Sequence, residues 1–450
     1  MRPDLAARYA DERLPRYTSY PTAPQFSAAV GPSRYAEWLG EVPADARGSL
    51  YVHIPFCRRM CWYCGCNTSV ATRQQPVTDY LASLGAEIGM VAGRLPVHLA
   101  VTHLHFGGGT PTIVQPAELI AVMARLRGAF DIRSGAEVAI EIDPRVLTAE
   151  MAAALGKAGF TRASLGVQSL DPAVQAAISR RQSFAETAAA VEKLRGAGIE
   201  GINLDLIYGL PHQTVTSCLE TVRACLALRP DRFSVFGYAH VPDFKRHQRR
   251  IDAAALPGGH QRNDQAEAIA AEIEAAGYDR IGLDHFALPA DAMAEAAGTG
   301  ALHRNFQGYT TDAADLLIGL GASAIGRLPQ GYVQNAAVTR DYLAAIARGE
   351  LAAVRGFSLR DDDRLRADLI ERLMCDFRVD IADVCGRHGV PVDAVADALP
   401  ILDRLAADGV LRRDGAMVEM AGDARTLVRV AAAAFDAYRA GSGAVHSRAV

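Results

Sequence analysis

Short apolar runs alternate with helical patterns along residues 48–240, and this alternation limits the folds open to the chain. The runs predicted as strands cover residues 49–55, 101–106, 137–143, 162–168, 201–209 and 232–240. Strands separated by helices pair in parallel as βαβ units. About six or seven such units in succession predict an α/β fold, a full or partial barrel.

Residues that can carry chemistry lie at the carboxyl ends of these predicted strands, where barrel enzymes place their active sites. A group of cysteines from Cys57 to Cys66 follows the first strand, and Gly107–Gly109 end the second. The later strands end at or near Glu141, Gln168, Asp205 and Ala239. The sequence therefore predicts one site at this end of the barrel.

The clustered cysteines suggest a metal site. Cys57-x3-Cys61-x2-Cys64 offers three thiolates on one loop, which would leave one iron of a four-iron cluster open. A zinc knuckle is the alternative, but zinc usually needs a second Cys or His pair, and none follows. Disulfides are not expected, since they belong chiefly to small secreted domains. The other cysteines are interpreted as buried small side chains: Cys218, Cys225, Cys375 and Cys385.

Composition indicates a folded protein without a dominant charge. Apolar residues make up 50%, charged residues 22%, and the formal net charge is −4. These values exclude a disordered chain and a nucleic-acid protein that binds through a global basic field. No stretch approaches the roughly 18 apolar residues of a membrane span, and the first residues lack the apolar segment of a secretory signal. We therefore expect a soluble, cytoplasmic protein.

Three regions are expected along the chain. Residues 1–46 are rich in Pro, Tyr and Arg and predict an extended arm over the active site. Residues 47–357 form the predicted catalytic domain, and residues 358–450 a small, mainly helical domain in which residues 407–420 suggest a hairpin. An irregular arm of this kind can act as a lid that excludes water.

The cysteine spacing after the first strand resembles that of the radical S-adenosylmethionine (SAM) superfamily. Longer strings are similar to the family of oxygen-independent coproporphyrinogen III oxidases, also called coproporphyrinogen dehydrogenases. These strings are YVHIPFC, CWYCGCN, HFGGGTPT, VQSLD, NLDLIYGLP, GLDHF and RNFQGYTT, and the resemblance extends from about Arg16 to Phe377. It implies a partial (β/α) barrel of the radical SAM type.

The resemblance implies one [4Fe-4S] cluster and two molecules of SAM. The implied cluster ligands are Cys57, Cys61 and Cys64. The implied contacts of the first SAM, which binds the open iron, are Tyr51, Tyr63, Gly108 and Glu141. Those of the second SAM are Gly109, Thr110, Gln168, Arg180, Asp205, Ala239 and Ile325. The chain departs from the family at Ser179, where an Asn commonly precedes the arginine.

These residue types suit such ligands. Glycines let backbone N–H groups approach a ligand closely. Acids such as Glu141 and Asp205 accept hydrogen bonds from ammonium or hydroxyl groups, and Arg180 can pair with a carboxylate. The alternatives are a plain turn, a helix cap and a surface arginine. Pro144 makes Asp143 the better cap candidate, which leaves Glu141 for a ligand.

The resemblance implies oxidative decarboxylation of two propionates of coproporphyrinogen III to vinyl groups, which yields protoporphyrinogen IX. The propionate β-hydrogen is on an unactivated carbon, so a side-chain base cannot remove it as a proton. In the superfamily, cleavage of SAM gives a 5′-deoxyadenosyl radical that abstracts the hydrogen atom. The expected partners are an electron donor such as flavodoxin or ferredoxin and an unidentified electron acceptor, and we expect a monomer that binds no nucleic acid and no membrane.

Two residues are candidates for a direct catalytic role. Cys66 is interpreted as a residue near the substrate or the SAM pair and not as a ligand, because a fourth thiolate would block the open iron. If the chain is extended there, successive side chains point to opposite faces; packing of a small side chain is the alternative. For His53, on the first strand, the alternative is a core histidine with satisfied nitrogens.

The four carboxylates of the implied substrate predict a locally basic site. The candidates for it are Arg16, Lys245, Arg246, Arg249, Arg250 and Arg304. For the run of residues 245–250, a solvated helix face is an equal alternative.

Two other functions compete with the oxidase. A haem-binding chaperone of the same superfamily usually lacks the arm motif of residues 16–22 and has an aromatic residue in place of Cys66. This chain has the arm motif and has Cys66, which favours the oxidase. A haem-degrading radical SAM methyltransferase would form a methylated product.

Overall fold

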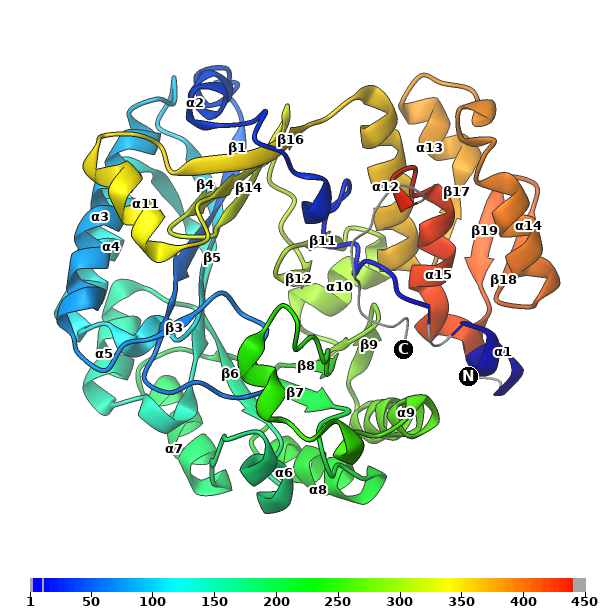
Figure 1. The fold of residues 1–450 in the computed structure, drawn as a ribbon, viewed down its shortest axis with the longest axis horizontal. Coiled ribbons are helices and arrows are strands. Elements are labelled where there is room, and N and C mark those ends of the chain that lie inside the picture. The colour runs from blue at the N-terminus through cyan, green and yellow to red at the C-terminus, as the bar shows by residue number, and fades with distance from the viewer. Residues whose placement is uncertain (1–2, 10–11, 440–450) are drawn as a thin grey trace.

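A mixed sheet of 12 strands forms the centre of the computed structural model, which describes residues 3–9 and 12–439 (Figure 1). In sheet order the strands are β16 (Ala353–Ser358), β15 (Gly331–Asn335), β14 (Ile325–Leu328), β13 (Leu316–Leu320), β1 (Arg47–Ile54), β4 (Ala100–Gly108), β5 (Asp131–Ile142), β6 (Arg162–Gln168), β7 (Gly201–Tyr208), β8 (Arg232–Gly237), β10 (His285–Ala287) and β9 (Asp279–Ile281). The strands from β13 to β8 are parallel, and those at both edges are antiparallel. Because the order ends at β16 and β9 instead of closing, the sheet is a partial barrel.

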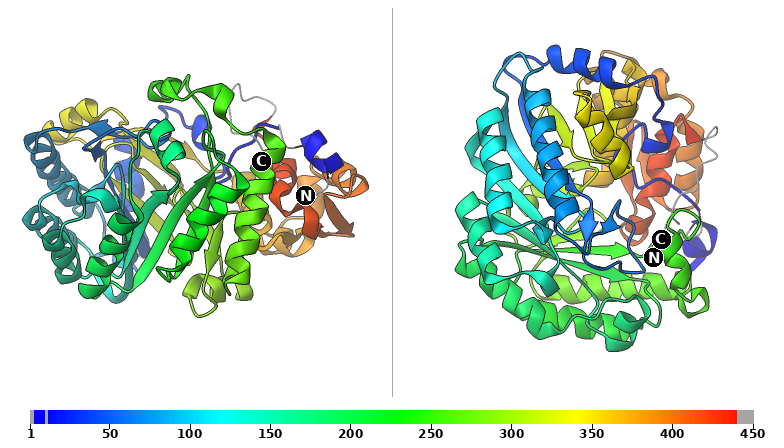
Figure 2. Two further views of the ribbon diagram at one scale, coloured as in Figure 1. Left: turned by 90° about the horizontal axis from the view of Figure 1, so that it is seen from below. Right: turned by 60° about the vertical axis from the view of Figure 1, so that its left-hand side comes forward.

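The predicted alternation of strands and helices is confirmed. The six predicted strands are β1 and β4 to β8, and β13 is a further parallel strand. Helices cover the outer face of the sheet (Figure 2). In chain order these helices are α3 (Gln75–Ala92), α4 (Pro116–Ala129), α5 (Ala149–Ala158), α6 (Pro172–Ala177), α7 (Phe184–Gly196), α8 (Val215–Leu226) and α9 (Gly259–Ala275).

Local sequence signals account for several element ends. Ser183 and Glu186 form a capping box at the start of α7. The carboxylate of Asp143 accepts a hydrogen bond from the N–H of Arg145 in the turn after β5. This contact confirms Asp143 as the cap of that turn.

A second, smaller core lies in the C-terminal region. Its elements are α12 (Asp361–Asp376), β17 (Arg378–Asp380), α13 (Ile381–Arg387), α14 (Leu399–Ala407), β18 (Leu411–Asp414), β19 (Met417–Met420) and α15 (Val428–Ala432). Strands β18 and β19 pair antiparallel, which confirms the hairpin. The end of the predicted C-terminal domain, residues 440–450, lies outside the described residues.

The predicted arm contains two helices, α1 (Pro3–Tyr9) and α2 (Pro32–Gly40). Leu5, Leu14 and Tyr17 pack into the C-terminal core, and α1 lies beside the C-terminal elements in Figure 1. The start of the predicted arm is therefore part of the C-terminal core. That the arm covers the active site stays a prediction.

The remaining elements are short. They are β2 (Phe56–Cys57), β3 (Ser69–Val70), α10 (Ala292–Thr299), β11 (His303–Asn305), β12 (Gly308–Thr310) and α11 (Thr339–Ala347), in addition to several single 3₁₀ turns. None of the helices described in the structure is both long and apolar enough to cross a membrane.

A buried carboxylate joins the outer helices to one edge of the sheet. Glu87 of α3 accepts hydrogen bonds from the N–H of Gly321 at 2.7 Å, the amide of Asn335 at 2.6 Å and the hydroxyl of Tyr342 at 2.7 Å. The side chain is 1% exposed, and burial raises its pKa to about 7. Three donors from three segments therefore depend on one acidic side chain.

We expect Glu87 to make the protein less stable as the pH rises from about 4.5 to about 7. The folded pKa lies above the ordinary value of 4.5, so the folded state binds the proton more tightly, and this advantage is lost as the pH passes the folded pKa. Glu87→Gln should remove this part of the pH dependence. Urea unfolding of both proteins at about pH 5 and about pH 8 measures it; an equal loss of stability in both would contradict the expectation.

Candidate functional site

The cysteine loop leaves the sheet at the end of β1. Cys57 ends β2, which pairs in parallel with β3, so the two ends of the loop are tied together. The Sγ atom of Cys57 accepts hydrogen bonds from the hydroxyls of Thr68 and Thr110, each at 3.4 Å. Burial raises the pKa of Cys57, and the two hydroxyls oppose this effect.

The second cysteine, Cys61, faces two guanidinium groups. The Nη atoms of Arg180 and Arg145 lie 3.6 and 3.7 Å from its Sγ atom. Asp143 forms ion pairs with both arginines, at 3.4 Å with Arg180 and 2.6 Å with Arg145. N–H donors to a cysteine sulfur are among the groups that set the potential of a bound iron–sulfur cluster.

The chain bends at Cys66 and Asn67, so the alternation expected of an extended segment does not apply there. The bend brings the thiols of Cys64 and Cys66 together, and the hydrogen bond between them lowers the pKa of Cys64 to about 7. Cys66 is exposed, and Cys61 is buried.

Within residues 3–9 and 12–439, no three His, Cys, Asp or Glu side chains lie close enough together to hold one metal ion. A single zinc ion binds each thiolate at about 2.3 Å and therefore needs its sulfurs close together. The thiolates of a cube-shaped cluster bind different irons and lie farther apart. Cys57, Cys61 and Cys64 share one loop, and three thiolates are the ligand type that an iron–sulfur cluster takes.

Residues expected to contact the first SAM meet at the end of β4. The N–H of Gly108 donates to Oε2 of Glu141 at 3.1 Å. A Cβ atom on Gly107 would lie 2.8 Å from Oε1 of Glu141 and 2.9 Å from the hydroxyl of Tyr51. A side chain at Gly107 would therefore displace the ends of Glu141 and Tyr51. Tyr63, the fourth expected contact, lies on the cysteine loop.

His53 is a buried histidine with both ring nitrogens in use. Nδ1 is 2.9 Å from the hydroxyl of Tyr51, and Nε2 is 2.9 Å from the carbonyl oxygen of Asn67. Burial lowers the pKa of His53. These contacts match the structural alternative for this residue, and a catalytic role stays a prediction.

Some residues expected at the second SAM lie on β6 and β7. Asp205 accepts hydrogen bonds from Ser164 and Asn203, both at 2.8 Å, and burial raises its pKa to about 6. Gln168 ends β6 in the left-handed region, with φ of 69°. Arg180 donates to the carbonyl of Gly166 on the same strand at 2.6 Å.

Others reach the site from elsewhere in the sheet. Gly109 and Thr110 follow β4, and Ala239 follows β8, which ends three residues earlier than predicted, at Gly237. Ile325 begins β14 and packs against Gly319, which pairs with Tyr51 of β1. The antiparallel pairing of β13 with β14 thus brings Ile325 close to Gly319, beside β1.

The basic run of residues 245–250 holds the cysteine loop. Lys245 donates to the carbonyl of Cys66 at 2.9 Å, His247 contacts the carbonyl of Cys64 at 2.7 Å, and Gln248 donates to that of Tyr63 at 2.9 Å. Gln248 is fully buried. Three side chains of the run, Arg246, Arg249 and Arg250, are exposed, as the alternative of a solvated face expects. The uncharged Gln248, which charge patterning missed, helps to position the loop.

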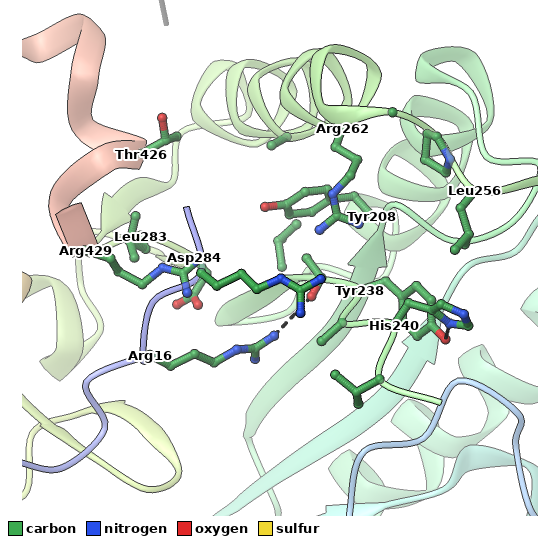
Figure 3. A pocket seen from close by; sticks show the side chains of 18 of the residues that line it. Arg16, Tyr208, Tyr238, His240, Leu256, Arg262, Leu283, Asp284, Thr426 and Arg429 are labelled. Atoms are coloured by element: carbon green, nitrogen blue, oxygen red, sulfur yellow. Dashed lines mark hydrogen bonds between the residues drawn. The ribbon is translucent and has the colours of Figure 1, made fainter. Parts of the chain in front are cut away.

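A cavity of about 630 Å³ adjoins this site at the end of β8 (Figure 3). Its lining includes Ala239 and reaches the arm, α9, β11 and α15. Of the basic candidates, Arg16 and Arg304 line it, whereas residues 245–250 do not appear in its lining. Further arginines line it that no motif indicated: Arg13, Arg262, Arg280 and Arg429.

Comparisons with known proteins agree with this geometry. Residues 51–225 match the family model of the radical SAM superfamily. The chain is 57% identical to oxygen-independent coproporphyrinogen III oxidase of Bradyrhizobium diazoefficiens, over 100% of both chains, and 43% identical to the Pseudomonas aeruginosa enzyme, over 97% of this chain and 95% of the relative. The structure of coproporphyrinogen III oxidase from Escherichia coli, described as a radical SAM enzyme, matches with a TM-score of 0.90 and 37% identity, over 95% of this chain and 100% of that one.

Fold, cysteine loop and family match together define a radical SAM protein. Within that superfamily, the chain belongs to the oxygen-independent coproporphyrinogen III oxidase family.

We expect Gly109→Ala to loosen the cysteine loop. The new Cβ atom would lie 2.4 Å from the hydroxyl of Thr68 and 2.6 Å from the carbonyl oxygen of Phe56, so β2 must move. Overpacking of this kind costs about 1–3 kcal/mol, and iron retention should fall with it. Gly128→Ala in α4, where nothing lies within 4 Å, is the matched control. Thermal unfolding and iron content measure both effects; wild-type values for Gly109→Ala would contradict the close approach.

Proposed function

We propose that this protein decarboxylates two propionate side chains of coproporphyrinogen III to vinyl groups without O₂ and so forms protoporphyrinogen IX. Full-length identity of 57% to the Bradyrhizobium diazoefficiens enzyme carries the proposal. Each propionate loses a β-hydrogen atom, CO₂ and one electron. Because the hydrogen is on an unactivated carbon, ordinary acid–base catalysis does not suffice.

Cys57, Cys61 and Cys64 would hold one [4Fe-4S] cluster. When bound, the cluster and SAM supply a carbon-centred radical that removes a hydrogen atom from the substrate. The hydroxyls of Thr68 and Thr110 donate to Cys57 at 3.4 Å. Together with the guanidinium groups beside Cys61, they supply the hydrogen bonds to sulfur that tune a cluster.

Two molecules of SAM would bind at the carboxyl ends of the strands. Glu141 can accept a hydrogen bond from an ammonium group, and Arg180 can pair with a carboxylate. The guanidinium of Arg180 is buried and its Nε atom lacks a hydrogen-bond partner within the described chain. A buried donor without a partner is costly, which supports a ligand at Arg180.

The remaining partners follow from the electron balance. A reduced carrier such as flavodoxin or ferredoxin would deliver the electron needed for SAM cleavage, and an acceptor would take the electron left after each loss of CO₂. The protein would act as a monomer. The alternative of a haem-binding chaperone finds no support among these relatives, which are named as oxidases.

The test is an anaerobic assay with coproporphyrinogen III, SAM, a reductant and the reconstituted protein. Protoporphyrinogen and 5′-deoxyadenosine should form together. Haem binding without turnover would indicate the chaperone, and a methylated product would indicate a methyltransferase; either result would overturn the proposal.

Replacing Cys57, Cys61 or Cys64 by Ala should abolish the oxygen-sensitive brown chromophore and all SAM cleavage, because two thiolates are too few anchors for the cluster. Iron content and absorbance spectra measure the change. Cys218→Ala, in a buried helix position away from the loop, should keep the chromophore. Full iron and activity in any loop variant would refute the ligand assignment.

Cys66→Ser should keep iron and the cluster spectrum but form much less protoporphyrinogen. The reason is that Cys66 is proposed to lie beside the substrate or the SAM pair, as a donor of a hydrogen bond, a proton or an electron. The hydrogen bond between the thiols of Cys66 and Cys64 puts Cys66 at the border of the proposed cluster site, which supports a role near the reacting groups. Loss of iron would make Cys66 a ligand, and wild-type turnover would make it a packing residue.

A further inference from the structure

The lining of the cavity at the end of β8 has an excess of positive charge. Among the described residues it contains six arginines, and its acids are Asp243 and Asp284. Burial would raise the pKa of Asp284, but the hydrogen bond from His285 and the charges of Arg304 and Arg16 lower it to about 2. Asp284 is therefore negatively charged at neutral pH. Even with this negative charge, the six arginines leave the cavity with an excess of positive charge.

Three of these arginines come from separate parts of the chain: Arg16 from the arm, Arg304 from β11 and Arg429 from α15. Figure 3 shows the side chains of Arg16 and Arg429 directed into the cavity near Asp284. Burial, together with the charge of Arg16, lowers the pKa of Arg429 to about 10. Arg429 is buried, Arg304 is half-buried and Arg16 is exposed, so like charges lie close together in a cavity that is partly shielded from solvent.

Backbone carbonyls accept some of the donors of this group. Arg304 donates to the carbonyl of Arg16 at 3.2 Å, Arg429 to that of Leu14 at 3.3 Å, and Arg16 to that of Gly237 at 3.2 Å. Carbonyl groups carry no net charge. Within the described residues, the buried Nε and Nη1 atoms of Arg304 have no hydrogen-bond partner.

The orientation of Arg304 is set by its neighbours. Its guanidinium lies 4.4 Å from the centre of the Tyr309 ring, and its backbone N–H donates to Glu371. A preorganised guanidinium loses little freedom when it binds an anion. A charged acceptor would stabilise the buried Nε and Nη1 donors of Arg304 best.

We infer that Arg16, Arg304 and Arg429 form a carboxylate anchor, which binds a propionate that is not reacting while another propionate lies at the SAM residues. The inference rests on the proposed function and deepens it. Ala239 lines the same cavity and is an expected contact of the second SAM, so the anchor adjoins the reacting region. The cavity volume of about 630 Å³ is within the usual range of small-molecule sites, about 300–1,000 Å³.

Binding of coproporphyrin III, the stable oxidised tetracarboxylate, to the full-length holoprotein tests this anchor. Its uncharged tetraamide is the ligand control. Arg304→Gln and Arg429→Gln should each weaken binding of the acid about 10-fold or more and leave the Kd of the tetraamide unchanged, because a charge-assisted hydrogen bond is lost only with the acid. Arg304→Lys should restore part of the affinity. Arg223→Gln, at an exposed arginine paired with Glu272 on the outer helices, should bind as wild type does.

The comparison of the acid with its tetraamide distinguishes a lost contact with a carboxylate from a general loss of folded structure, because misfolding would weaken binding of both ligands. Equal weakening of acid and tetraamide, or unchanged binding of the acid in both Gln variants, would overturn the anchor. Failure of the proposed function is a different result, since the wild-type protein would then not decarboxylate coproporphyrinogen III at all. If the anchor holds, Arg304→Gln should also raise the KM for coproporphyrinogen III more than it lowers kcat.

Discussion

The site depends on a close backbone approach between the end of β4 and the start of the cysteine loop. The N–H of Gly109 donates to the carbonyl of Ile54 at 2.9 Å, and that of Thr110 to the carbonyl of Phe56 at 2.8 Å. A side chain at Gly109 would collide with Phe56. This contact places Thr110 against Cys57 and holds the loop over the carboxyl ends of the parallel strands, so the proposed cluster ligands and the proposed SAM contacts lie at the same end of the sheet.

The opposite border of the site is made by segments distant in sequence. Side chains of residues 245–250 form hydrogen bonds with backbone carbonyls of the cysteine loop. The N-terminal segment before β1 packs into the C-terminal core. Leu14 and Tyr17 are buried in that core, while Arg16 between them lines the cavity. A truncation of this segment would therefore remove core side chains together with Arg16 of the cavity, so lost activity would not by itself identify the predicted lid.

Much of the fold could be predicted because the parallel strands are long, apolar and separated by capped helices. The strands β13 to β16 escaped because they are short and join the sheet only after the chain has returned to β1. In addition, β14, β15 and β16 pair antiparallel, so they do not continue the βαβ pattern. Part of the proposed site could likewise be predicted from the sequence pattern. Glu141, Gln168 and Asp205 lie at or near the ends of predicted strands. Ile325 lies on β14, which was not predicted, so only the family resemblance indicated it.

By itself, the sequence determined the local features of this protein: the order of strands and helices, the spacing of Cys57, Cys61 and Cys64, and the glycines that end β4. These are set by periodicity, caps and neighbours within a few residues. Only the tertiary structure decided that Gln248 holds the loop and that Arg16, Arg304 and Arg429 share one cavity. A single arginine or glutamine has no local signature, because its partners are hundreds of residues away and its role arises from burial and shared charge.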